Sequence, residues 1–350
     1  MKIPTNIILF SGIGTAFGAG VLLKDYYGGE RYKEKHDILA KTVIITGANT
    51  GIGKETAKEL ATRGGRLILA CRNLEKCEKT KDEIIQESFN KSIVCKKLDL
   101  ASCESIRNFA KTVVEEERHI DILINNAGVM ACPKEFTEDG FEWQLGVNYL
   151  GPFLLTNLLL DKLKQSPSAR IINLVSPLYK RSKINFEDLN SVQNYHPKEA
   201  YGVSKLALML FSQELARRLE VELIVYEMFT GFACRWPDHR DSEQCWDSVL
   251  NITVNCAIPG ISKTEIGRHL PMAQAKFSGG LLSPVMWLAM KTPLQAAQTS
   301  VYLAVDPSLE KVTGKLFFNS RETSIASPAL DKEVAKRMWL ISEKWTKLSS

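Results

Sequence analysis

A tyrosine and a lysine stand four positions apart in the segment Tyr201-Gly202-Val203-Ser204-Lys205. In an α-helix this spacing places both side chains on one face. A phenol with its ordinary pKa of about 10 is a weak acid–base catalyst at neutral pH. A neighbouring cation favours the phenolate and brings that pKa toward the working range. The pair therefore predicts general acid–base chemistry, although the same spacing also arises by chance in helices.

A glycine-rich turn, Thr46 to Gly53, follows the β-branched run 42–45 and precedes a helical stretch over 54–62. Glycines at such a turn let the backbone approach a pyrophosphate closely, and a helix N-terminus offers N–H groups and a positive dipole end. The sequence therefore predicts a dinucleotide site here. The residues expected to form it are Gly47, Ala48, Asn49, Thr50, Gly51, Ile52 and Gly53.

Short apolar runs alternate with helical stretches from Lys41 onward. Such runs predict a parallel sheet that is covered by helices on both faces. With right-handed crossovers, this pattern indicates one doubly wound, Rossmann-type α/β domain. The expected strands are 42–45, 67–70, 92–94, 120–124, 170–175, 252–255 and 315–318.

The glycine spacing, Gly-x-x-x-Gly-x-Gly, and the motifs that follow it resemble the short-chain dehydrogenase/reductase family from about residue 40 to 319. In that family an aspartate after the third strand contacts adenine, a match to Leu98-Asp99-Leu100. The segment Asn125-Asn126-Ala127-Gly128 matches the motif after the fourth strand. Pro259-Gly260 with Thr264 matches the nicotinamide-side loop. The resemblance therefore implies cofactor contacts by Asp99, Asn126, Ala127, Gly128, Pro259, Gly260 and Thr264.

The same resemblance assigns the catalytic group. It implies that Tyr201 is the acid–base residue and that Lys205 also holds the nicotinamide ribose. Ser176, 25 positions before Tyr201, matches the serine that orients the substrate. Asn148 matches the asparagine that holds a water in the proton relay. Val175 and Pro177 depart from the usual neighbours of that serine, so the strand end could be reshaped.

The end of the second predicted strand, Ala70-Cys71-Arg72-Asn73, bears on the choice of dinucleotide. An NAD site places a carboxylate there to accept from the ribose 2′-hydroxyl, and none is present. Arg72 can instead pair with a 2′-phosphate, with Lys54 as a second nearby charge. The sequence therefore predicts NADP(H), and the alternative is that Arg72 is a solvated surface charge.

Several further stretches resemble the retinol dehydrogenase subfamily, among them Thr46–Lys54, Thr137–Glu142 and Glu265–His269. This implies NADPH-linked reduction of all-trans-retinal, or the reverse oxidation, at a membrane. The apolar run 281–290 is either packed core or the wall of a lipophilic pocket. By resemblance the mitochondrial inner membrane is the first expected location and the endoplasmic reticulum the second. A catalytically silent NADP-binding sensor or scaffold is the alternative function.

The chain divides into one domain with three attachments. Residues 1–38 hold an uncharged stretch, 3–23, that is long enough to cross a bilayer at about 1.5 Å per residue, and so predict a membrane anchor and linker. A cleaved signal and a peripheral or buried segment remain alternatives. Residues 39–322 form the reductase domain, interrupted by an atypical insertion, 221–250. That insertion is either a surface excursion or a segment that damages the fold, and we favour damage.

The C-terminal tail, 323–350, carries an apolar seam at helical spacing. It either docks on its own domain or contacts a membrane or a second copy of the chain, which would make a homodimer. The seam consists of Val334, Met338, Ile341, Trp345 and Leu348.

The composition bears on nucleic-acid binding, on metal binding and on the state of the cysteines. The formal net charge is +5, and the sequence holds no dense Lys/Arg block, so nothing favours nucleic-acid binding. The eight cysteines form no CxxC pair and no zinc-ligand spacing, so we predict no metal site. We expect them to be small buried hydrophobic residues in a reducing compartment, with Cys234 and Cys245 the only two that lie close together in a loop-like stretch.

Overall fold

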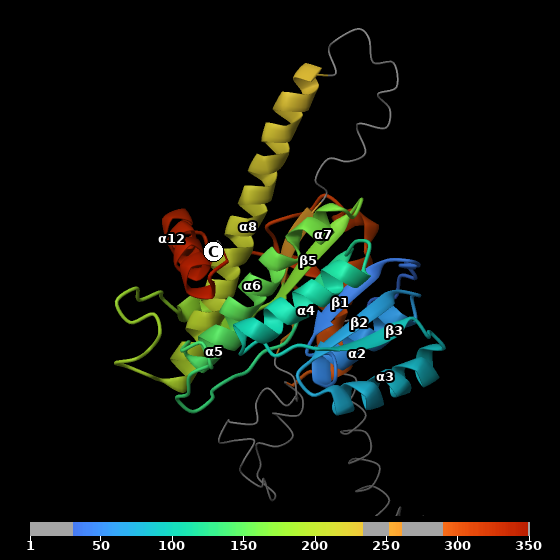
Figure 1. The fold of residues 1–350 in the computed structure, drawn as a ribbon, viewed down its shortest axis with the longest axis horizontal. Helices are drawn as coiled ribbons and strands as arrows, with labels where there is room; N and C mark the ends of the chain where they lie inside the picture. The colour runs from blue at the N-terminus through green and yellow to red at the C-terminus, as the bar shows by residue number, and fades with distance from the viewer. Residues whose placement is uncertain (1–30, 234–251, 261–289, 349–350) are drawn as a thin grey trace, which may run out of the picture.

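One eight-stranded sheet organises the computed structural model, which describes residues 31–233, 252–260 and 290–348 (Figure 1). Its strand order is β3-β2-β1-β4-β5-β6-β7-β8, and all neighbours are parallel except the antiparallel pair β7–β8. The expected Rossmann-type domain is confirmed. The strands are β1 (Thr42–Thr46), β2 (Arg66–Cys71), β3 (Ile93–Lys97), β4 (Ile122–Asn125), β5 (Ala169–Leu174), β6 (Ile252–Ile258), β7 (Leu316–Phe318) and β8 (Arg321–Thr323).

Helices cover both faces of this sheet and bury two separate apolar clusters. One cluster lies beneath α2 (Gly51–Ala61), α3 (Leu74–Ser88) and α11 (Pro293–Val305). The other lies beneath the remaining helices. These are α4 (Cys103–Glu116), α5 (Trp143–Leu145), α6 (Gly151–Leu158), α7 (Leu160–Lys164), α8 (Pro197–Ala233) and α12 (Lys332–Thr346).

The order of the strands reverses at β1, which lies between β2 and β4. Chains leaving β1 and β4 turn to opposite sides at such a switch point, and the crevice between them is where doubly wound sheets bind ligands. The glycine turn follows β1, and the Asn126–Gly128 segment follows β4. The topology therefore brings these two predicted motifs to one crevice.

Helix α8 continues into the predicted insertion and projects beyond the sheet (Figure 1). Leu219 is still buried, whereas Val221 and Ile224 are exposed. After the insertion, β6 pairs with β5 from Ile252 to Ala257 and then with β7, so the sheet is continuous. Whether the insertion damages the fold stays a prediction. Residues 234–251, with Cys234 and Cys245, lie outside the described residues.

The C-terminal seam packs on its own domain. The ring of Trp339 lies 5.1 Å from that of Phe153 and 5.6 Å from that of Phe211, centroid to centroid. Trp345 stacks on Phe141 at 5.8 Å, and the guanidinium of Arg218 lies 4.0 Å above the Trp339 ring. Helix α12 therefore completes the core over α6 and α8 (Figure 1).

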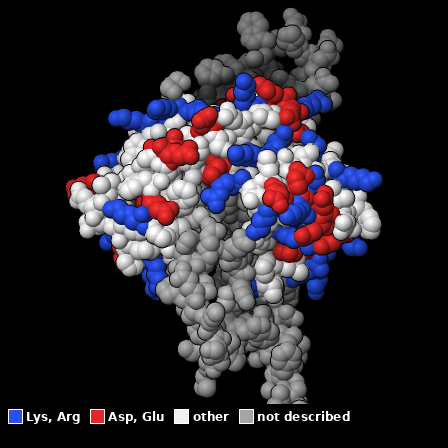
Figure 2. All heavy atoms as spheres, turned by 60° about the horizontal axis from the view of Figure 1, so that its bottom comes forward, with Lys and Arg blue, Asp and Glu red and all other residues white. Residues whose placement is uncertain are grey.

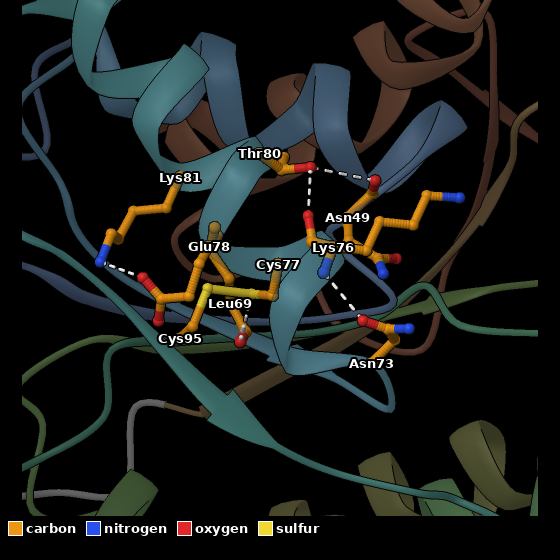
Figure 3. Close-up of a disulfide and its surroundings, with 9 residues drawn as sticks. All are labelled: Asn49, Leu69, Asn73, Lys76, Cys77, Glu78, Thr80, Lys81 and Cys95. Carbon is orange, nitrogen blue, oxygen red and sulfur yellow. Dashed lines mark hydrogen bonds and ion pairs between the residues drawn. A yellow bond between two sulfur atoms is a disulfide. The ribbon is translucent and has the colours of Figure 1, made fainter.

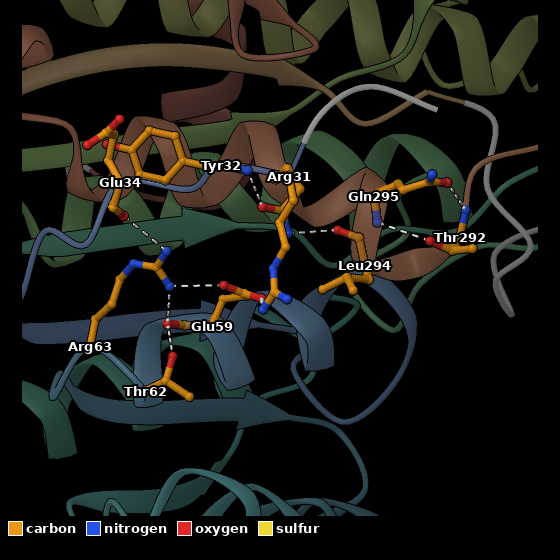
Figure 4. A network of polar contacts seen from close by, with 10 residues as sticks. Arg31, Tyr32, Glu34, Glu59, Thr62, Arg63, Thr292, Leu294 and Gln295 are labelled. Carbon is orange, nitrogen blue, oxygen red and sulfur yellow. Dashed lines mark hydrogen bonds and ion pairs between the residues drawn. The ribbon is translucent and has the colours of Figure 1, made fainter. Parts of the chain in front are cut away.

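The first described residues, 31–38, form a strap across α2 and α11 (Figure 4). Arg31 and Arg63 both pair with Glu59, at 2.5 Å and 2.9 Å. Tyr32 donates its hydroxyl to Asp306 at 2.8 Å, and its N–H to the Gln298 side chain at 2.9 Å. The predicted anchor, 3–23, lies outside the described residues. Within the described residues no helix is both long and apolar enough to cross a membrane.

Cys77 of α3 and Cys95 of β3 form a disulfide, which corrects the expectation that the cysteines are reduced (Figure 3). Helix α3 leads into the edge strand β3 and packs back on it, so residues 18 positions apart come within 6.0 Å at their Cα atoms. Sequence spacing alone does not reveal this approach. Of the other described cysteines, Cys71, Cys132 and Cys256 are buried and Cys103 is half-buried.

Loss of this bridge should lower thermal stability. A disulfide that closes a loop of about this size stabilises a fold by roughly 3 kcal/mol in the chain-entropy model, which corresponds to a Tm shift of about 6–12 °C in a domain of this size. Cys95→Ser should show that shift, and its Tm should not respond to dithiothreitol. Wild-type protein with the same Tm in oxidising and reducing buffer would contradict the bridge.

Candidate active site

A cavity of about 340 Å³ opens at the crevice between β1 and β4. Segments that follow β1, β2, β3 and β4 all contribute to its wall. The structure thus brings together most of the predicted cofactor residues. Those lining it are Gly47, Asn49, Thr50, Gly51, Ile52, Gly53, Arg72, Asp99, Asn126, Ala127 and Gly128. Ala48 is not among them, because its side chain is fully buried beneath the turn.

The glycine turn interlocks with the segment after β4 so closely that side chains would not fit. A Cβ on Gly53 would lie 2.4 Å from the Gly47 carbonyl oxygen and 2.5 Å from Nδ2 of Asn126. Gly47 has φ +66°, and a Cβ there would lie 3.0 Å from Ala127. Asn126 locks the contact by donating Nδ2 to the Thr46 carbonyl at 2.7 Å. The bare main chain is thereby left to face a ligand.

The N-terminus of α2 faces the same cavity. Thr50, its N-cap residue, makes no side-chain hydrogen bond to the first turn, and Gly51, Ile52 and Gly53 line the cavity wall. N–H groups that no side chain caps, at the positive end of a helix dipole, suit an anionic group. The residues present therefore fit the pyrophosphate of a dinucleotide.

Two cations lie at the end of the cavity beside β2. Arg72 is exposed and lines the wall, as predicted. Lys76, which the sequence reasoning missed, lines it from the first turn of α3, next to Asn49 in Figure 3. The N-cap Asn73, which accepts the N–H of Lys76 at 2.8 Å, was the signal that α3 begins here. Lys54 instead pairs with Glu83 and is not among the lining residues.

Asp99 reaches the cavity from the segment after β3. Its Oδ1 accepts the N–H of Ala101 at 3.0 Å, and its own N–H donates to Ser105 Oγ at 3.0 Å. These bonds hold the carboxylate at the cavity wall, where the resemblance places the adenine contact. Elsewhere on the surface the charges are mixed in sign. On the face that Figure 2 shows, Lys and Arg side chains are interspersed with Asp and Glu over the described residues.

Tyr201, Ser176 and Lys205 meet at the carboxyl end of β5. Tyr201 is buried, and its hydroxyl lies close enough to the Ser176 side chain to lower the pKa of the phenol. Lys205 donates Nζ to the Leu174 carbonyl at 2.9 Å, and that nitrogen lies 5.9 Å from the centroid of the Tyr201 ring. The single helix α8 presents both residues, as the four-residue spacing predicts.

Burial changes the expected electrostatics of this pair. Desolvation raises the pKa of Tyr201 to about 12, while the Ser176 side chain lowers it. Burial lowers the pKa of Lys205 to about 8. The expected lowering of the tyrosine pKa by the lysine is not seen, because burial is the largest influence on that pKa and raises it. A phenol with so high a pKa is protonated at neutral pH.

Asn148 joins this group from a π-helical turn, Gly146–Leu150, between α5 and α6. It is fully buried, and Nδ2 donates to the Val129 carbonyl at 2.9 Å and to Ser204 Oγ at 3.0 Å. Its Oδ1 accepts the Val129 N–H at 2.8 Å. Both side-chain donors are thus used, one on the segment after β4 and one on Ser204 of α8, so a relay water would need the second lone pair of Oδ1 or the main chain.

The remaining predicted residues follow β5 and β6. Pro177 does not distort the strand end, because it opens a 3₁₀ helix, Pro177–Arg181, for which Ser176 is the N-cap. Pro259 and Gly260 directly follow β6. Thr264 and the apolar run 281–289 lie outside the described residues. The roles of all these residues stay predictions.

The family model described as short chain dehydrogenase matches residues 41–232. Retinol dehydrogenase 13 of Mus musculus is 49% identical over 335 residues, which cover 95% of this chain and 92% of that protein. Retinol dehydrogenase 13 of Homo sapiens is 48% identical, with 97% and 94% covered. The expected resemblance to retinol dehydrogenases is confirmed.

Solved structures share the fold. A putative uncharacterized protein from Mycobacterium paratuberculosis superposes with a TM-score of 0.67 at 30% identity, covering 91% of this chain and 98% of that one. A short chain dehydrogenase from Shigella flexneri, complexed with NADP, gives a TM-score of 0.58 at 23% identity, covering 82% and 100%. The chain belongs to the short chain dehydrogenase family and is an oxidoreductase.

Proposed function

We propose that this enzyme uses NADPH to reduce a lipophilic aldehyde or ketone to the alcohol, with all-trans-retinal as the foremost substrate, and that it also catalyses the reverse oxidation. The observation that carries the proposal is the buried Tyr201, which lies beside Ser176 and is presented with Lys205 at the same sheet edge as the dinucleotide cavity. The retinoid substrate is supported by the names of the relatives of nearly full length.

The residues of this site have separate roles in binding the substrate and in proton transfer. When bound, NADP(H) supplies or accepts the hydride. Ser176 and Tyr201 hold the substrate oxygen between their hydroxyls. Tyr201, protonated at neutral pH because burial raises its pKa to about 12, donates its proton to the oxygen during reduction. Lys205, charged below its pKa of about 8, stabilises the phenolate that remains.

Arg72 and Lys76 support the choice of NADP(H) over NAD(H). Both line the end of the cavity beside β2, where a ribose 2′-phosphate would lie. Guanidinium and ammonium groups recognise phosphate through charge-assisted hydrogen bonds. The sequence offers no carboxylate at the end of β2 to hold a ribose hydroxyl instead.

A membrane location is part of the proposal. The uncharged stretch 3–23 supports an anchor, with the mitochondrial inner membrane as first location and the endoplasmic reticulum as second. The disulfide favours a compartment in which such bonds persist. Because α12 uses its apolar seam within the domain, a homodimer would form through another surface.

A substrate panel tests the activity. We expect full-length protein in detergent or vesicles to oxidise NADPH with all-trans-retinal much faster than with steroid ketones or short-chain aldehydes. Faster turnover of another carbonyl class would overturn the retinoid assignment. Firm NADPH binding without turnover of any carbonyl would favour the alternative, a silent NADP-binding sensor or scaffold.

A further inference from the structure

Lys291 is a buried lysine that the proton-transfer scheme does not use. Only 7% of its surface is exposed, and it lies two positions before α11. Its Nζ donates to Oδ1 of Asn319 and lies 5.0 Å from the centroid of the Phe318 ring. No carboxylate within the described part of the chain forms an ion pair with it. Burying a charge is costly unless it is paired or hydrogen-bonded, so the contacts of Lys291 with Asn319 and Phe318 are what hold it in place.

The aliphatic stem of Lys291 lies directly against Gly260. A Cβ on Gly260 would come within 3.0 Å of both Cδ and Cε of the lysine. Gly260 has φ +84°, a conformation that L side chains rarely adopt. The lysine therefore supports a glycine turn that has no side chain of its own to hold its shape.

The acceptor Asn319 belongs to a tight hairpin turn. Asn319 and Ser320 both have positive φ, +53° and +57°, and join β7 to β8. The Ser320 N–H donates to Thr299 Oγ1 of α11 at 3.2 Å, which fastens the turn to that helix. Strand β7 in turn pairs with β6 up to Ile258 and Phe318. One lysine therefore connects the carboxyl ends of two neighbouring strands at the edge where the cofactor site lies.

We propose that Lys291 is a positioning residue: held through its ammonium by Asn319 and Phe318, it presses its stem against Gly260 and fixes the Pro259–Gly260 turn on the nicotinamide side of the cofactor. The inference rests on the proposed NADP(H) site. A small displacement of the nicotinamide ring slows hydride transfer strongly, because the reacting atoms must approach closely and in line. The phosphates, bound at the glycine turn and Arg72, are held independently of Lys291.

The test separates catalysis from cofactor affinity. Lys291→Met keeps the stem but removes the ammonium, and Asn319→Ala removes its acceptor. Each should lower kcat by about tenfold or more while the Kd for NADPH changes by less than about threefold. The double variant should be no slower than either single one, because both changes break one contact. Asn319→Asp, which keeps an acceptor, should retain most of the wild-type kcat.

Lys315→Met is the matched control. Lys315 is half-exposed, pairs with Glu322 on the same hairpin and lies at the opposite end of β7. The kcat of Lys315→Met should therefore equal that of wild type. Normal kcat in Lys291→Met and Asn319→Ala would overturn the proposal, as would Asn319→Asp as slow as Asn319→Ala. Loss of NADPH affinity in parallel with kcat would show a merely structural role.

A second readout does not need turnover. The fluorescence lifetime of NADPH bound to Lys291→Met should be shorter than on wild-type protein, because the nicotinamide ring is held less firmly. Equal lifetimes would contradict the positioning role. Absence of NADPH binding by wild-type protein would overturn the proposed function itself. If wild type binds NADPH but turns over no carbonyl, the lifetimes alone decide on Lys291.

Discussion

Tyr201→Phe is expected to lower kcat for retinal reduction by about 100- to 10,000-fold, the range that a positioned general acid contributes. The variant removes only the hydroxyl that lies near Ser176 and would donate the proton. Tyr201 is not among the residues lining the dinucleotide cavity, so the Kd for NADPH should stay within about threefold of wild type. Stopped-flow NADPH absorbance and NADPH fluorescence titration measure the two quantities.

The matched control is Tyr195→Phe. Tyr195 precedes Tyr201 by six positions and donates its hydroxyl to the Cys132 carbonyl at 2.7 Å, outside the group formed by Ser176 and Lys205. Its kcat should be much closer to wild type than that of Tyr201→Phe. Retention of wild-type turnover by Tyr201→Phe would refute the mechanism.

The direction of the pKa shifts predicts how the rate of reduction varies with pH. Burial raises the pKa of Tyr201 to about 12, so its phenol is protonated throughout the physiological range. Lys205, with its pKa lowered to about 8, is charged at pH 7 and loses that charge as the pH rises above 8. Proton donation and phenolate stabilisation are therefore both available below pH 8. Oxidation, which needs the phenolate as a base, gains as the pH rises.

Arg72→Glu is expected to weaken NADPH binding by about 10- to 100-fold while NADH binding changes little. The reason is that it replaces a charge-assisted phosphate contact by repulsion. Lys76→Met should weaken NADPH binding in the same selective way but less, since it removes one cation without adding an anion. Isothermal titration with both dinucleotides measures the ratio of the two affinities.

Lys79→Met is the control for this pair. Lys79 lies on α3 three residues after Lys76, but it is exposed and pairs with Glu75 at 2.7 Å, away from the cavity. Its NADPH and NADH affinities should match those of wild type. An equal fall in both affinities for Arg72→Glu would show that Arg72 does not read the 2′-phosphate.

The local sequence pattern was sufficient to predict the parallel strands, the glycine turn and the Tyr201–Lys205 pair. The β-branched runs predicted the seven parallel strands, since buried parallel strands are continuously apolar. The glycine turn was readable because its positions are fixed by backbone geometry: Gly47 needs φ +66° and Gly53 has no room for a Cβ. Tyr201 and Lys205 were readable because their spacing lies within one helix.

The features that could not be predicted arise where segments far apart in the sequence come close together in the fold. Cys77 and Cys95 meet because α3 packs back on the edge strand, and Lys291 meets Gly260 because β6 and β7 end side by side. The high pKa of Tyr201 comes from burial by the whole fold, which a four-residue spacing does not encode. No helix was predicted in the insertion 221–250, whereas α8 continues into it as far as Ala233.

The central claim is that the enzyme transfers a hydride from NADPH to retinal with the help of Tyr201. Transfer of deuterium from the cofactor to the product tests this claim most directly. Full-length protein should be incubated with all-trans-retinal and NADPH that carries deuterium at both positions of nicotinamide C4, and the retinol analysed by mass spectrometry. We predict retinol that is heavier by one deuterium at the former carbonyl carbon with wild-type protein, and almost none with Tyr201→Phe. Retinol without deuterium, or equal labelled product from both proteins, would contradict it.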